Sequence, residues 1–206
     1  MKELINEINE SQYVLIGIGS EWKLQDNKED LLKAYNKLAD ILKDKNYYIV
    51  TICTDDVIYE SNLSEERITA PCGSNKRYQC ENACKGIIKN ENEIDVTKDT
   101  CPMCGGKYEL NNVTSTNYNE DGYMESWKKY GLWLQGTLNR KITILELGTD
   151  FSYPTVIRWA FEKVAMINNK AYMYRISEKF WQLTEDIKDK AESIKENSVN
   201  YINKQM

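Results

Sequence analysis

Four cysteines in two close pairs are the residues of this sequence best suited to bind a metal. Cys80 and Cys84 enclose three residues, Cys101 and Cys104 enclose two, and sixteen residues separate the pairs. Four thiolates on short loops can surround a zinc ion tetrahedrally, and the metal then supplies folding energy that a polar segment lacks. The alternative, two disulfides, needs an oxidising compartment. We predict a closed structural zinc ribbon with no ligand position left for substrate.

The composition limits the chemistry that this chain can perform. Its 206 residues include no histidine, which excludes Ser-His and Cys-His pairs and histidine bases. A formal net charge of −5 argues against a nucleic-acid partner. We find neither a signal peptide nor an apolar run long enough to span a membrane, so we expect no membrane association and a cytoplasmic location with reduced thiols.

The elements that would position these residues begin with a βαβ unit. An apolar run at 13–16 ends in Gly17-Ile18-Gly19 and is typical of a buried strand. Asn27, with Asp30 three residues later, starts a helix, and a second strand covers 47–52. Two strands joined by a helix over about forty residues should be parallel.

The rest of the chain continues to alternate helices and strands. We expect a short strand at 67–70, a helix at 124–138, a strand at 142–147, a helix with Pro154 in its first turn, a strand at 171–176, and a closing helix over one sheet face that carries Leu183, Ile187, Ala191, Ile194 and Ile202. The predicted fold class is α/β. A discontinuous domain, residues 1–70 and 116–206, contains a Rossmann-like parallel sheet with helices on both faces. Residues 71–115 form an inserted zinc-ribbon module.

The carboxyl ends of the predicted parallel strands should form one rim. Gly17–Ser20 follows the first strand, Cys53–Asp56 follows the second, and Gly148-Thr149 follows a later one. Ligands of such sheets bind at this rim, where backbone amides and a hydroxyl can hold a pyrophosphate. The alternative is a plain glycine turn, because the full phosphate fingerprint needs a third glycine.

The order of these parts resembles the sirtuins, in particular a bacterial branch of that family. Tyr13–Gly19 resembles the family's first strand and Gly-Ala-Gly loop, and Thr51–Asp55 resembles Thr-Gln-Asn-Ile-Asp. Cys72-Gly73-Ser74 stands where the family has His-Gly-Ser. Gly148-Thr149-Asp150 stands for Gly-Thr-Ser, and Tyr174–Ser177 for a last strand that ends in an asparagine on the adenosine side.

The resemblance implies NAD-dependent removal of acyl groups from lysine, or transfer of ADP-ribose. The implied cofactors are zinc and either NAD or ADP-ribose, and the implied partners are an acyl-lysine protein or a nucleotide ligand. The residues carried over to cofactor binding are Gly17, Gly19, Gly148, Thr149, Asp150 and Ser177, and those carried over to catalysis are Cys72, Cys53 and Asp55.

Several departures from the family pattern fall in this one site. Cys72 replaces the histidine base, Cys53 replaces an asparagine, and Ser177 replaces the adenosine-side asparagine. The segment that closes over NAD in the family is missing, since only seven residues separate Gly19 from Asn27. Asp150 puts a carboxylate where a hydroxyl normally meets the cofactor, which is unfavourable beside a diphosphate unless a cation or protonation intervenes.

Two hypotheses follow. The first is a sirtuin-fold protein with weak or absent deacylation that binds NAD, ADP-ribose or a partner. The second is an active deacylase or ADP-ribosyltransferase in which a thiolate or the acyl oxygen takes the role of the base. A thiol could do so only if a cation lowered its pKa, and Lys76 and Arg77 are the nearest cations in sequence. Cys53 and Cys72 could also form a redox pair, with buried filler residues as the alternative.

Overall fold

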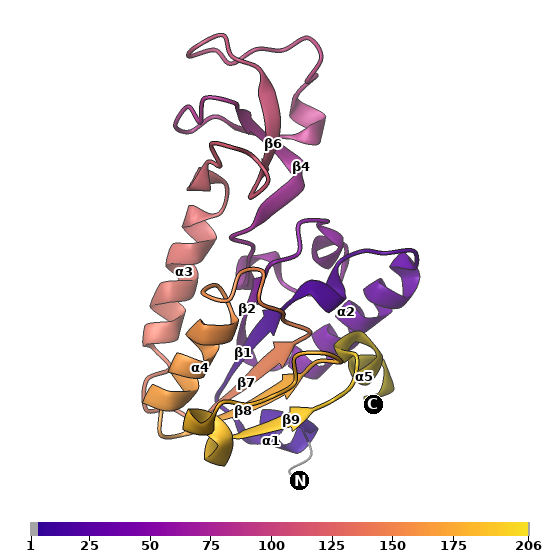
Figure 1. The fold of residues 1–206 in the computed structure, drawn as a ribbon, viewed down its shortest axis with the longest axis vertical. Helices are drawn as coiled ribbons and strands as arrows, with labels where there is room; N and C mark the ends of the chain where they lie inside the picture. The colour runs from indigo at the N-terminus through magenta and orange to yellow at the C-terminus, as the bar shows by residue number, and fades with distance from the viewer. Residues whose placement is uncertain (1–3, 206) are drawn as a thin grey trace.

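A six-stranded parallel sheet forms the body of the protein, seen in a computed structural model that describes residues 4–205. Its strand order is β3-β2-β1-β7-β8-β9, and a three-stranded antiparallel sheet, β5-β4-β6, projects away from it (Figure 1). The strands are β1 Tyr13–Ile18, β2 Asn46–Thr51, β3 Ile68–Thr69, β4 Gly73–Cys80, β5 Ile88–Asn90, β6 Tyr108–Asn112, β7 Ile142–Leu147, β8 Ala171–Ile176 and β9 Ala191–Ile194.

Helices cover both faces of the large sheet, as predicted. The helices are α1 Leu4–Glu10, α2 Lys28–Leu42, α3 Met124–Gln135, α4 Arg158–Ile167 and α5 Ser198–Lys204. Side chains of α1, α2 and α5 belong to one apolar cluster, and side chains of α3 and α4 belong to a second cluster. The two clusters form the two layers of the core. Within residues 4–205, no helix combines the length and apolar character needed to cross a lipid bilayer.

The predicted βαβ unit is confirmed. The Asn27 side chain accepts a hydrogen bond from the Asp30 amide at 3.1 Å, and α2 begins at Lys28. Strand β1 pairs in parallel with both β2 and β7. Since the chain turns from β2 and β3 back across to β7, the strand order reverses at the β1–β7 boundary. Ligand sites of open parallel sheets form at such a point.

Two predictions about local structure were wrong. The closing helix does not form; a 3₁₀ segment, Glu185–Lys190, leads into β9 and then into the short helix α5. The apolar spacing fits a helix, but β9 supplies backbone partners to β8 along four residues, which the helix could not do. Pro154 lies in the turn that precedes α4 and not in the first turn of that helix. Its carbonyl accepts a hydrogen bond from the Trp159 amide at 2.8 Å.

Gly17 lies inside β1 rather than in a loop, and helix α4 packs directly on it. A methyl group added at Gly17 would lie 2.3 Å from Ile157 Cγ2 and 2.8 Å from the Phe161 ring. Both neighbours are fully buried in the second apolar cluster, so neither has room to withdraw. Glycine at this position therefore sets the distance between α4 and the sheet.

We expect Gly17→Ala to lower the free energy of unfolding by about 1–3 kcal/mol, because the added methyl group must displace packed side chains. A matched control is Gly131→Ala in α3, where nothing lies within 4 Å of the added carbon. The control should raise stability by about 0.5–1 kcal/mol through helix propensity. Urea unfolding followed by circular dichroism measures both. Equal stability of the two variants would contradict the packing described for Gly17.

Candidate functional site

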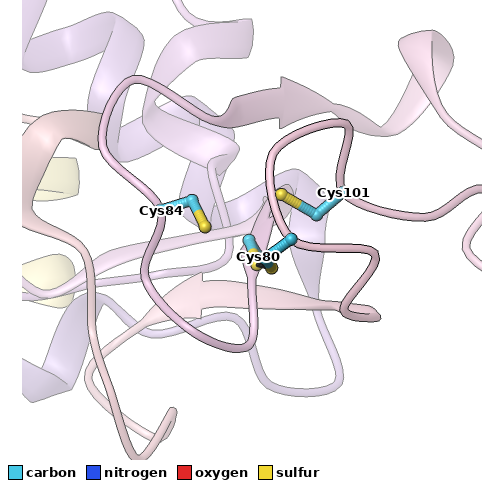
Figure 2. A group of neighbouring side chains, drawn as sticks. Cys80, Cys84 and Cys101 are labelled. Atoms are coloured by element: carbon cyan, nitrogen blue, oxygen red, sulfur yellow. Dashed lines mark hydrogen bonds between the residues drawn. The ribbon is translucent and has the colours of Figure 1, made fainter.

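The four paired cysteines come together as predicted. One sulfur atom from each of Cys80, Cys84, Cys101 and Cys104 lies within 4.8 Å of the others. Figure 2 shows Cys80, at the end of β4, with Cys84 from the following turn and Cys101 from the loop before β6. All six cysteines of the chain are free thiols. Four converging sulfurs match the tetrahedral ligand set of a structural zinc site, so the residues fit that metal.

Backbone turns hold these sulfurs in place. The Gly105 amide donates to the Cys101 carbonyl and the Cys101 amide to the Gly106 carbonyl, each at 2.8 Å. The Asn82 side chain and the Gly106 amide both donate to Cys104 Sγ at 3.4 Å. These two donors, with smaller contributions from the Cys80 and Cys84 thiols, lower the pKa of the Cys104 thiol to about 6. They favour the thiolate, which is the form that binds a metal.

Metal analysis should find about one zinc ion per chain. Cys101→Ser should lose most of the bound metal and lower the thermal midpoint, because the binding free energy of a structural zinc is folding free energy. Cys72→Ala is the matched control, since Cys72 lies outside the cluster, and it should keep the metal. Purified protein without zinc, or a Cys101→Ser variant with full zinc content, would contradict the assignment.

The rim glycines Gly19 and Gly148 bring the ends of β1 and β7 together, and their backbone amides already donate hydrogen bonds within the protein. The Gly19 amide donates to the Leu147 carbonyl and the Gly148 amide to the Ile176 carbonyl, each at 2.8 Å. Gly148 has φ of +63°, and a methyl group there would lie 2.4 Å from Glu21 Cβ. Only glycine therefore allows the 3₁₀ turn Ser20–Trp22 to lie against this strand end.

A buried ionic network lies just below the rim. Arg175 in β8 donates to both oxygens of Glu146 in β7, from Nε at 2.9 Å and from Nη2 at 2.8 Å. Arg158 adds a bond to Glu146 at 3.2 Å, and Glu162 accepts from Arg175 at 2.7 Å. The hydroxyl of Thr149 also donates to Glu146. Thr149 was expected to contact a ligand, but this hydroxyl is directed into the protein.

A pocket of about 680 Å³ opens at the rim where the strand order reverses. Gly148, Asp150 and Ser177 line it, which are three of the six residues predicted for cofactor binding; Gly17, Gly19 and Thr149 are not part of the lining. The lining carries five carboxylates and two lysines: Glu21, Asp26, Asp30, Asp150 and Glu178 against Lys23 and Lys179. The pocket is therefore acidic, which favours cations and disfavours a diphosphate.

Asp150 and Ser177 behave differently within this pocket. Burial raises the pKa of Asp150, but hydrogen bonds from Ser152 and Ser20 outweigh burial and leave that pKa below its ordinary value. Asp150 thus stays charged at neutral pH. The Ser177 hydroxyl is buried and donates to Glu21 Oε1 at 3.0 Å. Glu21 was not identified from the sequence, although a carboxylate directly after Gly-Ile-Gly-Ser is the signal that could have found it.

The two rim thiols are buried. Cys53 is 3% exposed and Cys72 is 1% exposed, and they belong to the two separate apolar clusters. Burial raises the pKa of each thiol to about 12, with Asp55 adding to the effect at Cys53. The Cys53 thiol donates to the Gly19 carbonyl at 3.3 Å. Neither group offers a thiolate at neutral pH.

The two cations nearest to Cys72 in sequence, Lys76 and Arg77, are engaged elsewhere. Lys76 pairs with Glu60 at 3.5 Å, and Arg77 donates to the Gly122 carbonyl. The cation that acts on Cys72 is Lys23, and its effect is smaller than that of burial.

Two acidic residues after β2 hold the surrounding loops. Asp55 accepts from the Leu24 amide at 2.8 Å and from the Val57 amide at 3.1 Å, so it fastens the loop after Gly19. Asp56, the next residue, has φ of +63° and accepts a hydrogen bond from the buried Ser74 hydroxyl. Burial raises the pKa of Asp56, with Ser74 and Arg77 opposing the shift. This contact ties β4 to the end of β2.

Cys53 and Cys72 should react slowly with a thiol reagent in the native protein. At pH 8 the small exposure and the pKa of about 12 leave both with little thiolate, so labelling should need unfolding. Mass spectrometry of the zinc-loaded protein, with and without urea, measures this. Rapid native labelling of either residue would contradict the burial. A Cys53–Cys72 crosslink after mild oxidation is the outcome that would support a redox pair over buried filler residues.

Comparisons with known proteins agree on the fold. No family model matches the chain. A curated relative, a probable bifunctional ADP-ribose hydrolase/ADP-ribosyltransferase of Fusarium oxysporum f. sp. cubense, is 24% identical over 139 residues. That match covers 58% of this chain and 23% of the relative, so it spans less than a quarter of the relative's length.

Solved sirtuin structures cover nearly the whole chain. A structure from a study of sirtuin substrate affinity is 12% identical with a TM-score of 0.65, covering 98% of this chain and 96% of its own. A mutant Sir2 homologue bound to ADP-ribose is 14% identical with a TM-score of 0.65, covering 98% and 94%. A Sir2 complex with an inhibitor, 2'-O-acetyl-ADP-ribose and a deacetylated peptide is 14% identical with a TM-score of 0.64, covering 98% and 96%. The predicted sirtuin-like fold is confirmed.

Proposed function

We propose that this chain, whose fold is sirtuin-like, is a zinc-containing binding protein in which NAD-dependent deacylation is weak or absent. The observation that carries the proposal is the state of Cys72 and Cys53. Both stand at positions that the resemblance assigns to catalysis, and both are buried thiols with a pKa of about 12. A general base needs a pKa near the working pH and access to the proton that it removes, and these thiols meet neither condition.

The carboxylates after β2 and the rim hydroxyls are already engaged in contacts within the protein. Asp55 accepts two backbone hydrogen bonds, and Asp56 is buried against Ser74. The hydroxyls of Thr149 and Ser177 donate to Glu146 and Glu21, so both are committed within the protein. These side chains therefore form hydrogen bonds that stabilise the fold, while the pocket beside them is retained.

The pocket remains the best candidate for ligand binding. Its position, where the strand order reverses, supports a nucleotide ligand. Sirtuin structures bound to NAD and to ADP-ribose share the fold, which supports the same ligands here. The acidic lining means that NAD or ADP-ribose would bind weakly unless a cation accompanies the diphosphate. A protein partner, including one with an acyl-lysine, is the other candidate, and we expect neither nucleic acid nor membrane. The six free thiols support a cytoplasmic location of the protein.

An active deacylase or ADP-ribosyltransferase with an unusual base is the alternative. The match to a probable ADP-ribose hydrolase/ADP-ribosyltransferase favours it, although that match spans 23% of the relative. In this case Cys72, Cys53 or Asp55 would have to gain access to the pocket through a change in the loops around them. Kinetics with NAD decide between the two proposals.

Zinc-loaded protein should turn over NAD with an acyl-lysine peptide at least about 10²-fold more slowly than an active sirtuin assayed in parallel, because a general base is worth about 10²–10⁴-fold in rate. Liquid chromatography of the products measures this. In parallel, calorimetry with ADP-ribose, NAD and nicotinamide tests binding. Nicotinamide release that Cys72→Ala abolishes would establish the active alternative. If none of the three ligands binds, the protein-partner proposal gains support over the nucleotide proposal.

A further inference from the structure

Glu21 is held by a cradle of four hydrogen-bond donors at the edge of the pocket. Its Oε1 accepts from the Ser177 hydroxyl at 3.0 Å and from the Glu178 amide at 2.8 Å. Its Oε2 accepts from the amide and the hydroxyl of Ser198, both at 2.7 Å. The donors come from the segment after β8 and from the start of α5, more than 150 residues away from Glu21 in the sequence.

The two hydroxyls of the cradle can only donate toward the carboxylate. The Trp22 indole N–H donates to Ser198 Oγ at 3.0 Å, and the Phe180 amide donates to Ser177 Oγ at 3.2 Å. A hydroxyl oxygen that accepts a hydrogen bond on one side points its own hydrogen away from that donor, which here means toward Glu21. Ser177 and Ser198 are 1% and 0% exposed, so water does not reorient them. The cradle thus presents four donors and no acceptor, an arrangement that suits the two oxygens of an anion.

All four donors are neutral, and the anion that they hold is provided by the short 3₁₀ turn Ser20–Trp22. Among residues 4–205, Glu21 has no ion pair with a lysine or arginine. The turn is fastened next to the carboxylate by the Glu21 amide, which donates to the Gly148 carbonyl at 3.2 Å. The arrangement is an oxyanion site filled from within the chain.

We propose that this cradle is a ligand subsite for an oxyanion, a carboxylate or a phosphate ester, and that Glu21 occupies it until such a ligand displaces it. The remaining pocket wall includes Asp26, Asp30 and Asp150. A ligand that replaces Glu21 should therefore carry one oxyanion on an otherwise neutral or cationic body. A tethered carboxylate competes at a high effective concentration, so a free small anion does not bind the unaltered protein.

Removing the internal carboxylate should open the subsite. We expect Glu21→Ala to unfold at a lower temperature than the unaltered protein, because four donors lose their acceptor. Formate and inorganic phosphate, titrated separately at constant ionic strength, should raise its midpoint in a saturable manner by about 2–4 °C. Formate alone would identify a carboxylate subsite, and phosphate alone a phosphate subsite.

Two control variants separate anion binding from a loss of charge. Asp26→Ala removes a carboxylate from the same pocket lining, and Asp26 has no hydrogen bond or ion pair within residues 4–205. It should not respond to either anion. Glu21→Gln keeps the side-chain size but places an amide in the cradle, so it should be destabilised and should not be rescued. The unaltered protein should also give no response.

A Glu21→Ala variant that responds to formate and phosphate no more than Asp26→Ala does would overturn the proposal. If Glu21→Ala is unfolded without added anion, near-ultraviolet circular dichroism during the same titrations decides: recovery of the native signal supports the subsite, and no recovery overturns it. These experiments use neither NAD nor an activity. The subsite can therefore fail while the proposed function stands, and the reverse also holds.

Discussion

A carboxylate without solvent contact, Glu146, is the charge on which this structure depends. Removing a charge from water costs several kcal/mol unless ionic partners and hydrogen bonds satisfy it, and Glu146 obtains Arg175 from the adjacent strand and Arg158 from α4. The two arginines then donate to the carbonyls of Phe180 and Gln182 and so fix the segment after β8. This segment forms one wall of the pocket. The shape of the candidate site is therefore a result of neutralising a charge in the core.

The cradle around Glu21 and the network around Glu146 have the same physical character. Each gathers donors around one carboxylate at the carboxyl edge of the sheet, and each takes up a hydroxyl that the resemblance would assign to a cofactor, Ser177 in one case and Thr149 in the other. The rim of the sheet is therefore satisfied by its own side chains. Both hydroxyls are thus committed to contacts within the protein, while the pocket beside them stays open.

The sequence predicted the parts of the fold that rest on local patterns. The strands β7 and β8 match their predicted bounds, Asn27 caps α2, and the four paired cysteines meet, because strand periodicity, capping and ligand spacing are all short-range signals. The prediction of a C-terminal helix was wrong because β9 pairs with a strand fifteen or more residues earlier, and no local sequence pattern indicates such a pairing. Burial of Cys53 and Cys72, and the bonds of Glu21, likewise arise from residues distant in sequence.

The large sheet ends in short strands on both sides, two residues in β3 and four in β9. The outer strands of a sheet expose unpaired backbone groups, and these invite another chain to add as a further strand. Here each exposed row is brief, and β9 carries Glu192 within it. The protein thus offers little template for edge-to-edge association.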